Sequence, residues 1–355
     1  MNDAKPPKGD GAGKSRRRMQ MADLAKLAGV APSTVSRALA DSELVSLETR
    51  ERIQTLARQF NYTINRAATR LRSGINRTIG VVVPYEQASR QSFADPFLHG
   101  MIGSLADALT QRDYEMLLVR IDAEKLDAAS ALIDAGRAAG VILIGQWRHH
   151  DQLNAMAERG LPLVVWGAQL PGQRYCTVGS DNRRGGQLAA QHLLAEGRRR
   201  IGFLGDVGLP EVAERYRGFA EVLKAHQVAL PDRRHASAPF LAGAGRMAMQ
   251  ALLEVEPELD AVFASGDLLA MAAIGALRES GRRVPEDVAV VGYDDVELAA
   301  HFSPHLTTVR QPIHEGGTTL VEALLQMIEH GEVMPSIQLE TQLIVRQSSH
   351  RGEIA

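Results

Sequence analysis

The sequence predicts an α/β protein with a small all-helical unit at its N-terminal end, and three observations support this. From about residue 79 onward, short apolar runs alternate with segments of helical period, as in parallel sheets covered by helices on both faces. Residues 19–62 contain helical periods without such runs. The length of 355 residues exceeds what one hydrophobic core normally holds, so at least two domains are expected.

A helix-turn-helix pattern occupies residues 21–39. A short helix with an apolar face stops at Gly29, and Pro32 favours a new start because its missing N–H has no partner in a first helical turn. The second helix carries small polar side chains and one arginine: Ser33, Thr34, Ser36 and Arg37. Such a helix fits the major groove of DNA, where arginine can read guanine and hydroxyl side chains can hold phosphates. The pattern therefore predicts a DNA-binding head.

Three segments make up the chain before residue 77. Residues 1–18, rich in Pro, Gly, Lys and Arg, are predicted to be a disordered basic tail. Residues 19–64 are predicted to be the helix-turn-helix domain, with a third helix after Ser46. Residues 65–76 begin with NRAATRLRSG, a helix so short that it is marginal alone in water. We therefore expect this last segment to be a hinge helix that forms only when something holds it.

The charge distribution is asymmetric although the net charge is only -2. Residues 1–76 hold 14 basic and 7 acidic side chains, whereas the remainder holds 26 basic and 35 acidic ones. A basic head on an acidic body indicates that only the head approaches a polyanion such as DNA.

The body is predicted to form two doubly wound parallel-sheet subdomains. Its apolar runs are residues 79–84, 115–121, 140–145, 162–167, 200–205, 260–266 and 288–295, and helix-length segments include 98–112, 186–196 and 267–281. Seven such strands exceed one sheet of this type. The expected subdomains comprise about 77–178 with 311–338, and about 179–310 with 339–355. Ligand sites in such folds lie at the carboxyl ends of the strands.

Composition argues against several other classes of protein. The single cysteine, Cys176, cannot form an intramolecular disulfide and is expected to be a small buried residue. No Cys/His spacing suggests a metal site, and no motif suggests a cofactor. Residues 1–18 do not read as a secretion signal, and no segment reaches the roughly 20 apolar residues of a membrane span. A cytoplasmic protein is expected.

Taken together, these features resemble the LacI/GalR (lactose-repressor) family of bacterial transcription regulators. The head contains DLAKLAGVAPSTVSRAL and NRAATRL, and the body contains VPEDVAVVGYDD at 284–295 and SPHLTTVRQP at 303–312. The resemblance implies a head followed by a two-lobed core like that of periplasmic binding proteins. It also implies a homodimer on a palindromic DNA operator, with a tetramer possible, and a small-molecule effector between the lobes.

The resemblance implies roles for several residues of the head and the hinge. It places Pro32, Ser33 and Arg37 where the recognition helix meets base edges, with Thr34 and Ser36 near phosphates. In the hinge, Asn65 can cap the short helix and is expected to contact the DNA. Leu71 follows at the family spacing, where a leucine wedges into the minor groove and kinks the operator.

The resemblance also implies an effector site in the body. Asp294 would accept hydrogen bonds from ligand hydroxyls and Arg215 would donate to the same ligand. Phe93 and Phe240 match positions where aromatic rings pack on the ligand. The other candidates are Trp166, Gln169 and Asp95.

The identity of the effector stays open at this point. Gly266 stands where many sugar-responsive relatives place an asparagine, so the pattern of hydroxyl recognition is not copied whole. A sugar or sugar derivative is the leading candidate, and a co-repressor such as a purine base is the alternative. A sugar-active enzyme with a DNA-binding head would need a nucleophile–base pair or a phosphate loop, and neither stands out. A periplasmic sugar-binding protein would need a signal peptide and no head.

Overall fold

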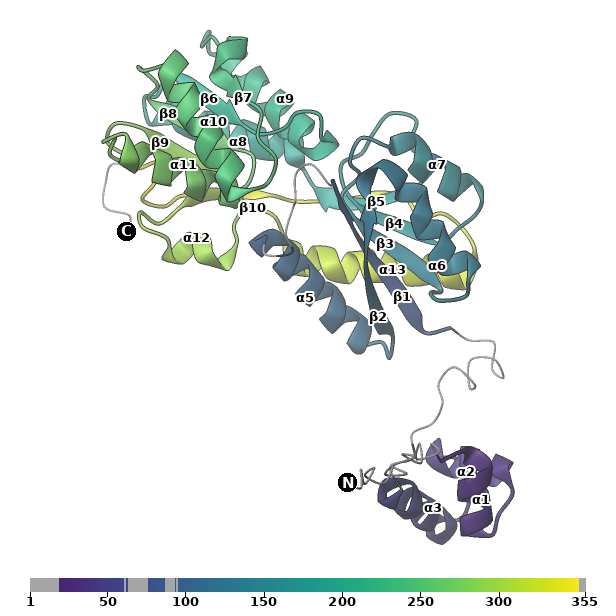
Figure 1. The fold of residues 1–355 in the computed structure, drawn as a ribbon. Coiled ribbons are helices and arrows are strands. Elements are labelled where there is room, and N and C mark those ends of the chain that lie inside the picture. The colour runs from purple at the N-terminus through teal and green to yellow at the C-terminus, as the bar shows by residue number, and fades with distance from the viewer. Residues whose placement is uncertain (1–18, 61, 63–75, 87–92, 94, 351–355) are drawn as a thin grey trace, which may run out of the picture. The chain divides into compact units, whose positions relative to one another are not determined.

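The computed structural model describes residues 19–60, 62, 76–86, 93 and 95–350. The chain divides into two compact units, Met1–Ile75 and Asn76–Ala355 (Figure 1). No helix among the described residues has both the length and the apolar character needed to cross a bilayer.

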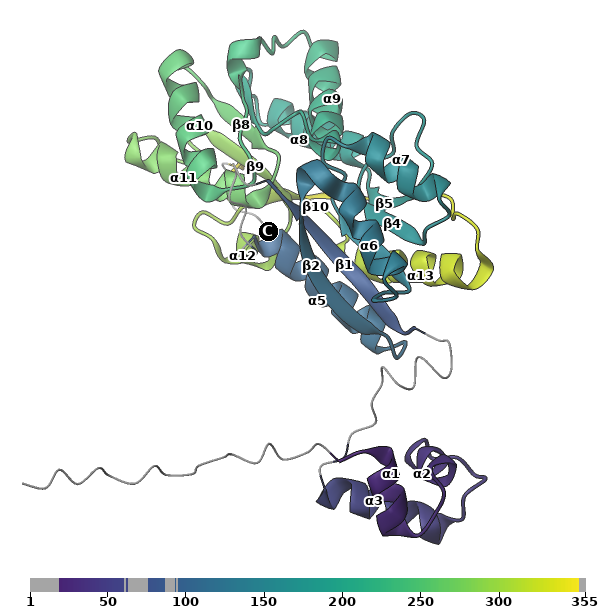
Figure 2. The same ribbon diagram turned by 45° about the vertical axis from the view of Figure 1, so that its right-hand side comes forward.

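The first unit contains a three-helix head (Figure 2). Its helices are α1 Met21–Ala28, α2 Pro32–Leu39 and α3 Leu47–Gln59. Helix α1 ends at Gly29, whose φ of 66° is the left-handed conformation that glycine adopts without strain. The head has its own core, in which Leu24, Val35 and Ile53 are fully buried. These side chains fix α2 against α1 and α3, so its outer face is presented on a rigid support.

The second unit contains two six-stranded sheets, in the orders β11-β5-β4-β3-β1-β2 and β12-β10-β9-β8-β6-β7. The strands of the first sheet are β1 Thr78–Tyr85, β2 Glu115–Asp122, β3 Gly140–Ile144, β4 Leu163–Trp166, β5 Cys176–Ser180 and β11 Ile337–Leu339. All of its paired strands are parallel. The second sheet consists of β6 Ile201–Leu204, β7 His235–Ala236, β8 Ala261–Ala264, β9 Ala289–Asp294, β10 Thr307–Arg310 and β12 Gln342–Ile344. Only β12 runs antiparallel to its neighbour.

Helices cover both faces of each sheet. The first subdomain carries α5 Pro96–Thr110, η1 Ala123–Ala129, α6 Ser130–Asp134, α7 His150–Glu158 and α13 Ile313–His330. Helices α5 and α13 pack on one face of its sheet, and η1, α6 and α7 pack on the other. The second subdomain carries α8 Asn182–Ala195, α9 Pro210–Ala225, η2 Asp232–Arg234, α10 Ala242–Val255, α11 Asp267–Glu279 and α12 Glu297–His301. Here α8 and α9 cover one face, and α10, α11 and α12 cover the other.

The predicted fold class is confirmed. All seven apolar runs contain strands, and most strand residues are buried because helices exclude water from both faces. Five further strands, β5, β7, β10, β11 and β12, were not predicted. They have two to five residues each and several carry polar side chains, so they lack the long apolar run that marked the others. Cys176, on β5, is fully buried.

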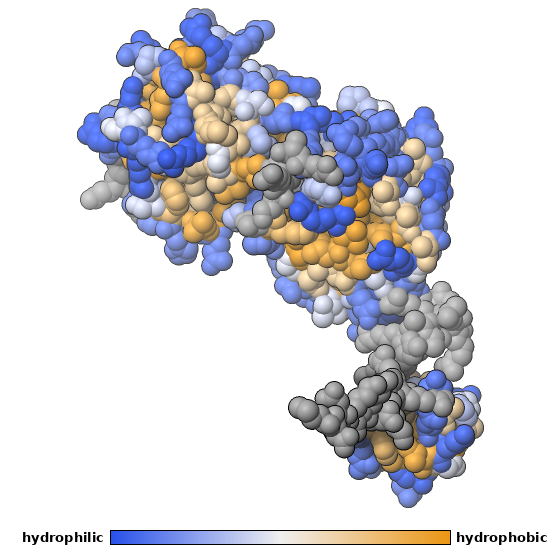
Figure 3. Space-filling view, viewed as in Figure 1, coloured by the Kyte–Doolittle hydropathy of each residue, from blue (hydrophilic) through white to orange (hydrophobic). Residues whose placement is uncertain are grey.

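Three segments connect the two subdomains. They follow β5, β10 and β11, where the chain passes from one sheet to the other or to a helix that packs on it. The surface of the first subdomain includes apolar area on the side of α5 and β2 (Figure 3), and Leu118 on the edge strand β2 is 40% exposed.

Candidate ligand cleft and nucleic-acid interface

A cleft lies between the two subdomains, at the carboxyl ends of their parallel strands. Its volume is about 900 Å³ when the solvent-filled mouth is included. Residues that follow β1, β3 and β6 and the last residue of β9 contribute to its walls, as the rule for α/β folds predicts. Predicted site residues that line it are Asp95, Trp166, Arg215, Phe240 and Asp294.

Arg215 is held at the cleft by partners on three sides. Its Nε donates to Oδ1 of Asn182 at 2.8 Å, and one terminal nitrogen donates to the carbonyl of Ser265. The guanidinium carbon lies 3.7 Å from the centroid of the Tyr293 ring. Only 4% of this residue is exposed, so contacts with the protein, and not with water, fix the position of the guanidinium group.

Close packing of α8 on α9 sets the position of Arg215. A Cβ on Gly186 would lie 2.0 Å from the carbonyl oxygen of Arg215, and one on Gly218 would lie 1.9 Å from that of Arg183. Only glycine allows the two helix backbones to approach this closely.

Asp294 ends β9 and turns its carboxylate toward the cleft. Nε2 of Gln311 donates to its Oδ1 at 2.6 Å, and the residue is 8% exposed. Burial raises the pKa of Asp294 to about 7, nearby Asp95 raises it as well, and Arg215 opposes the shift. The cleft thus holds a carboxyl group that titrates near neutral pH.

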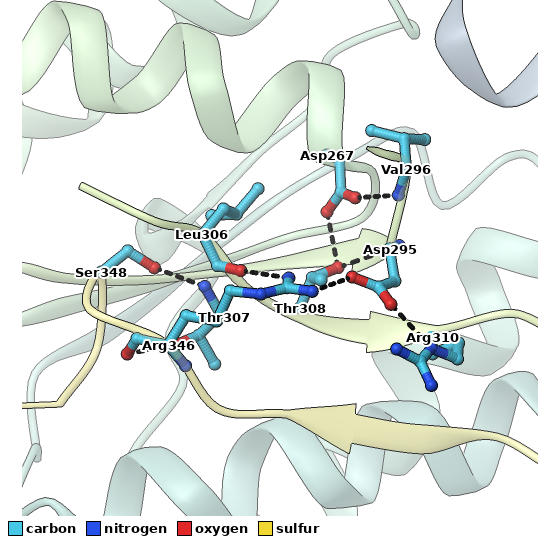
Figure 4. Close-up of polar contacts among 9 residues, drawn as sticks. All are labelled: Asp267, Asp295, Val296, Leu306, Thr307, Thr308, Arg310, Arg346 and Ser348. Atoms are coloured by element: carbon cyan, nitrogen blue, oxygen red, sulfur yellow. Dashed lines mark hydrogen bonds and ion pairs between the residues drawn. The ribbon is translucent and has the colours of Figure 1, made fainter. Parts of the chain in front are cut away.

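The loop after β9 is held in an unusual backbone conformation. Asp294 has a φ of 120° and Asp295 a φ of 54°, both in the region that favours glycine. The Asp295 carboxylate accepts from Nε of Arg310 and Nη2 of Arg346, each at 2.7 Å (Figure 4). Arg310 ends β10 and Arg346 follows β12, so residues from these two neighbouring strands hold the loop in place.

Asp267, at the start of α11, completes this support. Its carboxylate accepts from the backbone N–H of Val296 at 2.9 Å and from the hydroxyl of Thr308 at 2.6 Å (Figure 4). Burial, reinforced by the negative charge of Asp294, raises the pKa of Asp267 well above its usual value. These contacts fix the direction in which the neighbouring Asp294 points.

Further carboxylates come from elements that the sequence analysis did not single out. Glu211, in the first turn of α9, accepts from the backbone N–H of Gln146 at 3.3 Å, and burial raises its pKa. Arg148 pairs with Glu86 of the first subdomain and Asp206 of the second, so an ion-pair bridge joins the two sides of the cleft. Gln146, Arg148 and Asp206 all follow strands, and this place after β3 or β6 is the signal that could have identified them.

Aromatic side chains form the apolar part of the cleft. Trp166 and Phe97 have ring centroids 6.3 Å apart, and Trp147 and Phe240 line the same space. Trp147 was missed by the sequence analysis, although it follows β3. A Cβ at Gly266 would lie 3.0 Å from the Phe240 ring, so the glycine that replaces the expected asparagine makes room for this ring.

Two predicted candidates lie elsewhere. Phe93 is not among the residues that line the cleft, and the guanidinium of Arg120 lies 4.8 Å from its ring centroid. Gln169 lines two other depressions, one of them beside Ser180 and Asn182. No group of three or more possible metal-ligating side chains occurs within the described ranges.

The candidate nucleic-acid interface is the outer face of α2. Val35 and Ala38 are buried against the head, whereas Pro32, Ser33 and Arg37 are exposed and Thr34 and Ser36 are half-buried. Helical geometry therefore presents the predicted contact residues on one surface. Asn65 and Leu71, the predicted contacts of the hinge, lie outside the described residues.

Known proteins resemble both units. Residues 20–65 match the family described as bacterial regulatory proteins, lacI family, and residues 190–349 match a periplasmic binding protein-like domain. The transcriptional regulator CelR of Thermobifida fusca is 36% identical over 342 residues, which cover 94% of this chain and 99% of that protein. The repressor PurR of Aliivibrio salmonicida is 30% identical, over 93% of this chain and 98% of that protein.

Solved structures agree with these matches. A CelR–cellobiose complex is 34% identical with a TM-score of 0.68, and covers 94% of this chain and 100% of that one. The Lac repressor dimer bound to operator is 24% identical with a TM-score of 0.83, over 94% of this chain and 99% of that one. The head, the two parallel-sheet subdomains and the full-length relatives together establish that the chain belongs to the LacI family of bacterial transcriptional regulators.

Proposed function

We propose that this protein represses carbohydrate-utilisation genes and that a sugar bound in the interdomain cleft controls its grip on DNA. The observation that carries the proposal is that one cleft between the subdomains is lined by a buried guanidinium, by carboxylates and by aromatic rings. Sugars present hydroxyl groups that both donate and accept, and ring faces that are largely apolar. The cleft offers partners for both.

In this proposal each predicted effector residue that lines the cleft has a distinct role. Asp294 and Asp95 accept hydrogen bonds from sugar hydroxyls, because a carboxylate only accepts when ionised. Arg215 donates, and its existing bonds to Asn182 and Ser265 orient the group before the ligand arrives. Trp166 and Phe240 pack on the sugar faces. Cellobiose is the first probe, because a relative 34% identical is described as a CelR–cellobiose complex.

On the DNA side, we propose that α2 reads the major groove and that the chain acts as a homodimer. Arg37 is the side chain able to form a bidentate contact with guanine, worth about 1–3 kcal/mol of discrimination. One head reads one half-site, so a palindromic operator requires two chains related by a two-fold axis. Asn65 and Leu71 would add the hinge contacts to the minor groove.

Replacement of Leu71 by alanine is expected to weaken operator binding and to reduce the operator bend. A leucine wedge unstacks a base step at a cost of a few kcal/mol, and the bend that results brings more DNA surface into contact. Circular-permutation gel shifts measure the bend and filter binding measures the affinity, with Leu47→Ala, at an exposed position of α3, as the matched control. An unchanged bend in the Leu71→Ala protein would remove this residue from the interface.

The test of the whole proposal combines operator selection with ligand titration. The full chain should select palindromes from a random DNA library, with two chains on each duplex. Cellobiose should then stabilise the protein to heat by mass action and lower its operator affinity by about 5- to 150-fold, the usual range of allosteric coupling. Absence of any palindrome contradicts the DNA-reading part. Absence of a response to cellobiose and to a panel of other mono- and disaccharides contradicts the sugar part.

A nucleobase co-repressor is the second candidate effector. The aromatic walls of the cleft could stack on a planar base, and its carboxylates could accept from ring N–H groups. Hypoxanthine is the probe. Stronger operator binding in its presence, without a response to sugars, would favour this alternative.

A further inference from the structure

We propose that the cleft selects uncharged sugars and rejects sugars that carry a phosphate or carboxylate group. This inference rests on the proposed function, because it specifies the class of sugar that the same cleft accepts. It concerns the charge of the ligand, which the proposed function leaves open.

The described lining of the cleft contains more acidic than basic side chains. Its described residues include five carboxylates, those of Glu86, Asp95, Asp206, Glu211 and Asp294. Arg215 is the one cationic side chain among them. Among the described lining residues, a ligand anion would meet more carboxyl groups than cationic groups, and walls of low dielectric strengthen the repulsion from those that are ionised.

The single cation is poorly placed to bind an anion. Nε and one terminal nitrogen of Arg215 already donate to Asn182 and Ser265, and the guanidinium stacks on Tyr293. The positive charge of Arg215 lowers the pKa of Asp294, so these two charges of the second subdomain already act on one another. A phosphate would have to compete with this fixed carboxylate for the same guanidinium.

Helix N-termini, the other anion-binding device of such folds, hold carboxylates of the chain itself. At the start of α5, Oδ1 of Asp95 accepts from the backbone N–H of Phe97 at 3.0 Å. The first turn of α9 contains Glu211, and α11 begins with the buried Asp267. The dipoles of these three helices are thus offset by acidic side chains before any ligand enters.

The ion-pair bridge between the subdomains does not supply a free cation either. Arg148 is paired with both Glu86 and Asp206, which leaves the group of three with a net negative charge. These carboxylates line the cleft and retain 24% and 22% side-chain exposure, so an anion in the cleft would meet them without a free cation beside them.

A consequence concerns the origin of the effector. A sugar taken up with phosphorylation carries a dianion, whereas hydrolysis of a longer saccharide releases a neutral sugar. The cleft fits the product of a glycoside hydrolysis and not that of a phosphorylating step.

The experiment compares pairs of related sugars in which one member is neutral and the other is an anion. Cellobiitol and cellobionate are both open-chain at one end and differ only by a hydroxymethyl against a carboxylate group. Glucose and glucose 6-phosphate form a second pair. Calorimetric titration of the full chain at pH 7.5 should show the anion of each pair binding at least about tenfold more weakly, which is a lower bound on the effect of one charge–charge contact near a protein surface.

Salt and a variant separate repulsion from steric exclusion. High ionic strength should narrow the affinity ratio, because screening weakens repulsion and leaves shape unchanged. Asp206→Asn should also reduce the affinity ratio. Arg148 then has one carboxylate partner in place of two, so the group of three loses its net negative charge. The matched control is Asp134→Asn, which removes a carboxylate from an exposed ion pair with Arg159 outside the cleft and should leave the ratio unchanged.

The outcomes distinguish this inference from the proposed function. Neutral members that bind at least tenfold tighter, with a ratio that narrows in salt, support it. Equal or tighter binding of cellobionate or glucose 6-phosphate overturns it while the sugar-responsive regulator stands. The inference is also overturned if the ratio of neutral-sugar to anion affinity changes neither with salt nor in Asp206→Asn, because the anion would then be excluded by its shape. If no member of either pair binds and no other sugar does, the proposed function fails and this inference fails with it.

Discussion

Removal of residues 1–75 is expected to abolish operator binding while leaving ligand binding by the cleft intact. The chain divides into compact units between Ile75 and Asn76, and the buried side chains of the head contact one another. Every residue that lines the cleft has a number above 80. Gel shifts with the selected operator measure the loss of DNA binding, and cellobiose-dependent thermal shifts measure what the body retains.

A shorter truncation is the matched control. A chain without residues 1–18 keeps the whole helix-turn-helix and should still select the same operator. It loses six of the basic residues of the head segment, so its affinity should depend less steeply on salt if these residues contact phosphates. Loss of the thermal shift after removal of residues 1–75 would mean that the body requires the head in order to bind ligand.

The fold was predictable because its main signals are local. Val81, Val82 and Val83 lie in a continuous apolar run, and that run needs helices on both faces of its sheet wherever it lies. Gly29 and Pro32 mark the turn between α1 and α2 by their backbone chemistry alone. Short strands such as β7 and β11 were not predictable, since two or three residues carry no periodicity.

The cleft was predictable in part. Residues after long strands could be placed at the carboxyl edge of a sheet, and Asp294 and Trp166 line the cleft. Glu211 was overlooked because it lies inside a helical period, where a glutamate is ordinarily a solvated surface residue. Its burial depends on the packing of α9 against the first subdomain, which no local pattern encodes. Phe93 was predicted to lie in the site but is not among the residues that line the cleft. Its interaction with Arg120 could not be inferred from its neighbours in the chain.

Replacement of Asp294 by alanine is expected to give a protein that binds operator and no longer responds to its effector. The carboxylate is fixed by Gln311 and its loop is held through Asp295, so the ligand meets an acceptor already in place. Loss of hydrogen bonds to a charged group costs about 1.5–3 kcal/mol each, which corresponds to roughly 10- to 100-fold in affinity. Calorimetry measures the affinity, and gel shifts with and without sugar measure the response. A normal response would exclude Asp294 from the site.

The isosteric change Asp294→Asn is expected to alter the pH dependence of stability in a defined direction. Burial raises the pKa of Asp294 to about 7 in the folded protein, whereas an aspartate in an unfolded chain titrates near about 3.9. Between these values the unfolded chain releases a proton that the folded one keeps, so ionisation favours unfolding. The wild-type free energy of unfolding, relative to Asp294→Asn, should therefore fall as pH rises from about 4 to about 7 and stay level above, by up to about 4 kcal/mol.

Other charged groups act on Asp294, so a control residue whose pKa is shifted in the opposite direction is useful. The positive charge of Arg215 lowers the pKa of Asp294 and the negative charge of Asp95 raises it. Asp294 in turn raises the pKa of Asp267, so Asp267 contributes to the wild-type curve as well. At the surface, Arg283 holds the pKa of Asp287 down at about 2, mainly through a side-chain hydrogen bond. The stability that Asp287 contributes is present above pH 4 and lost as pH falls toward 2. The free energy of unfolding of the wild type, minus that of Asp287→Asn, should therefore rise with pH in that window. Urea unfolding of the three proteins from pH 2 to 8 measures both differences. Parallel curves for the two variants would show that Asp294 is not a buried carboxyl with a raised pKa.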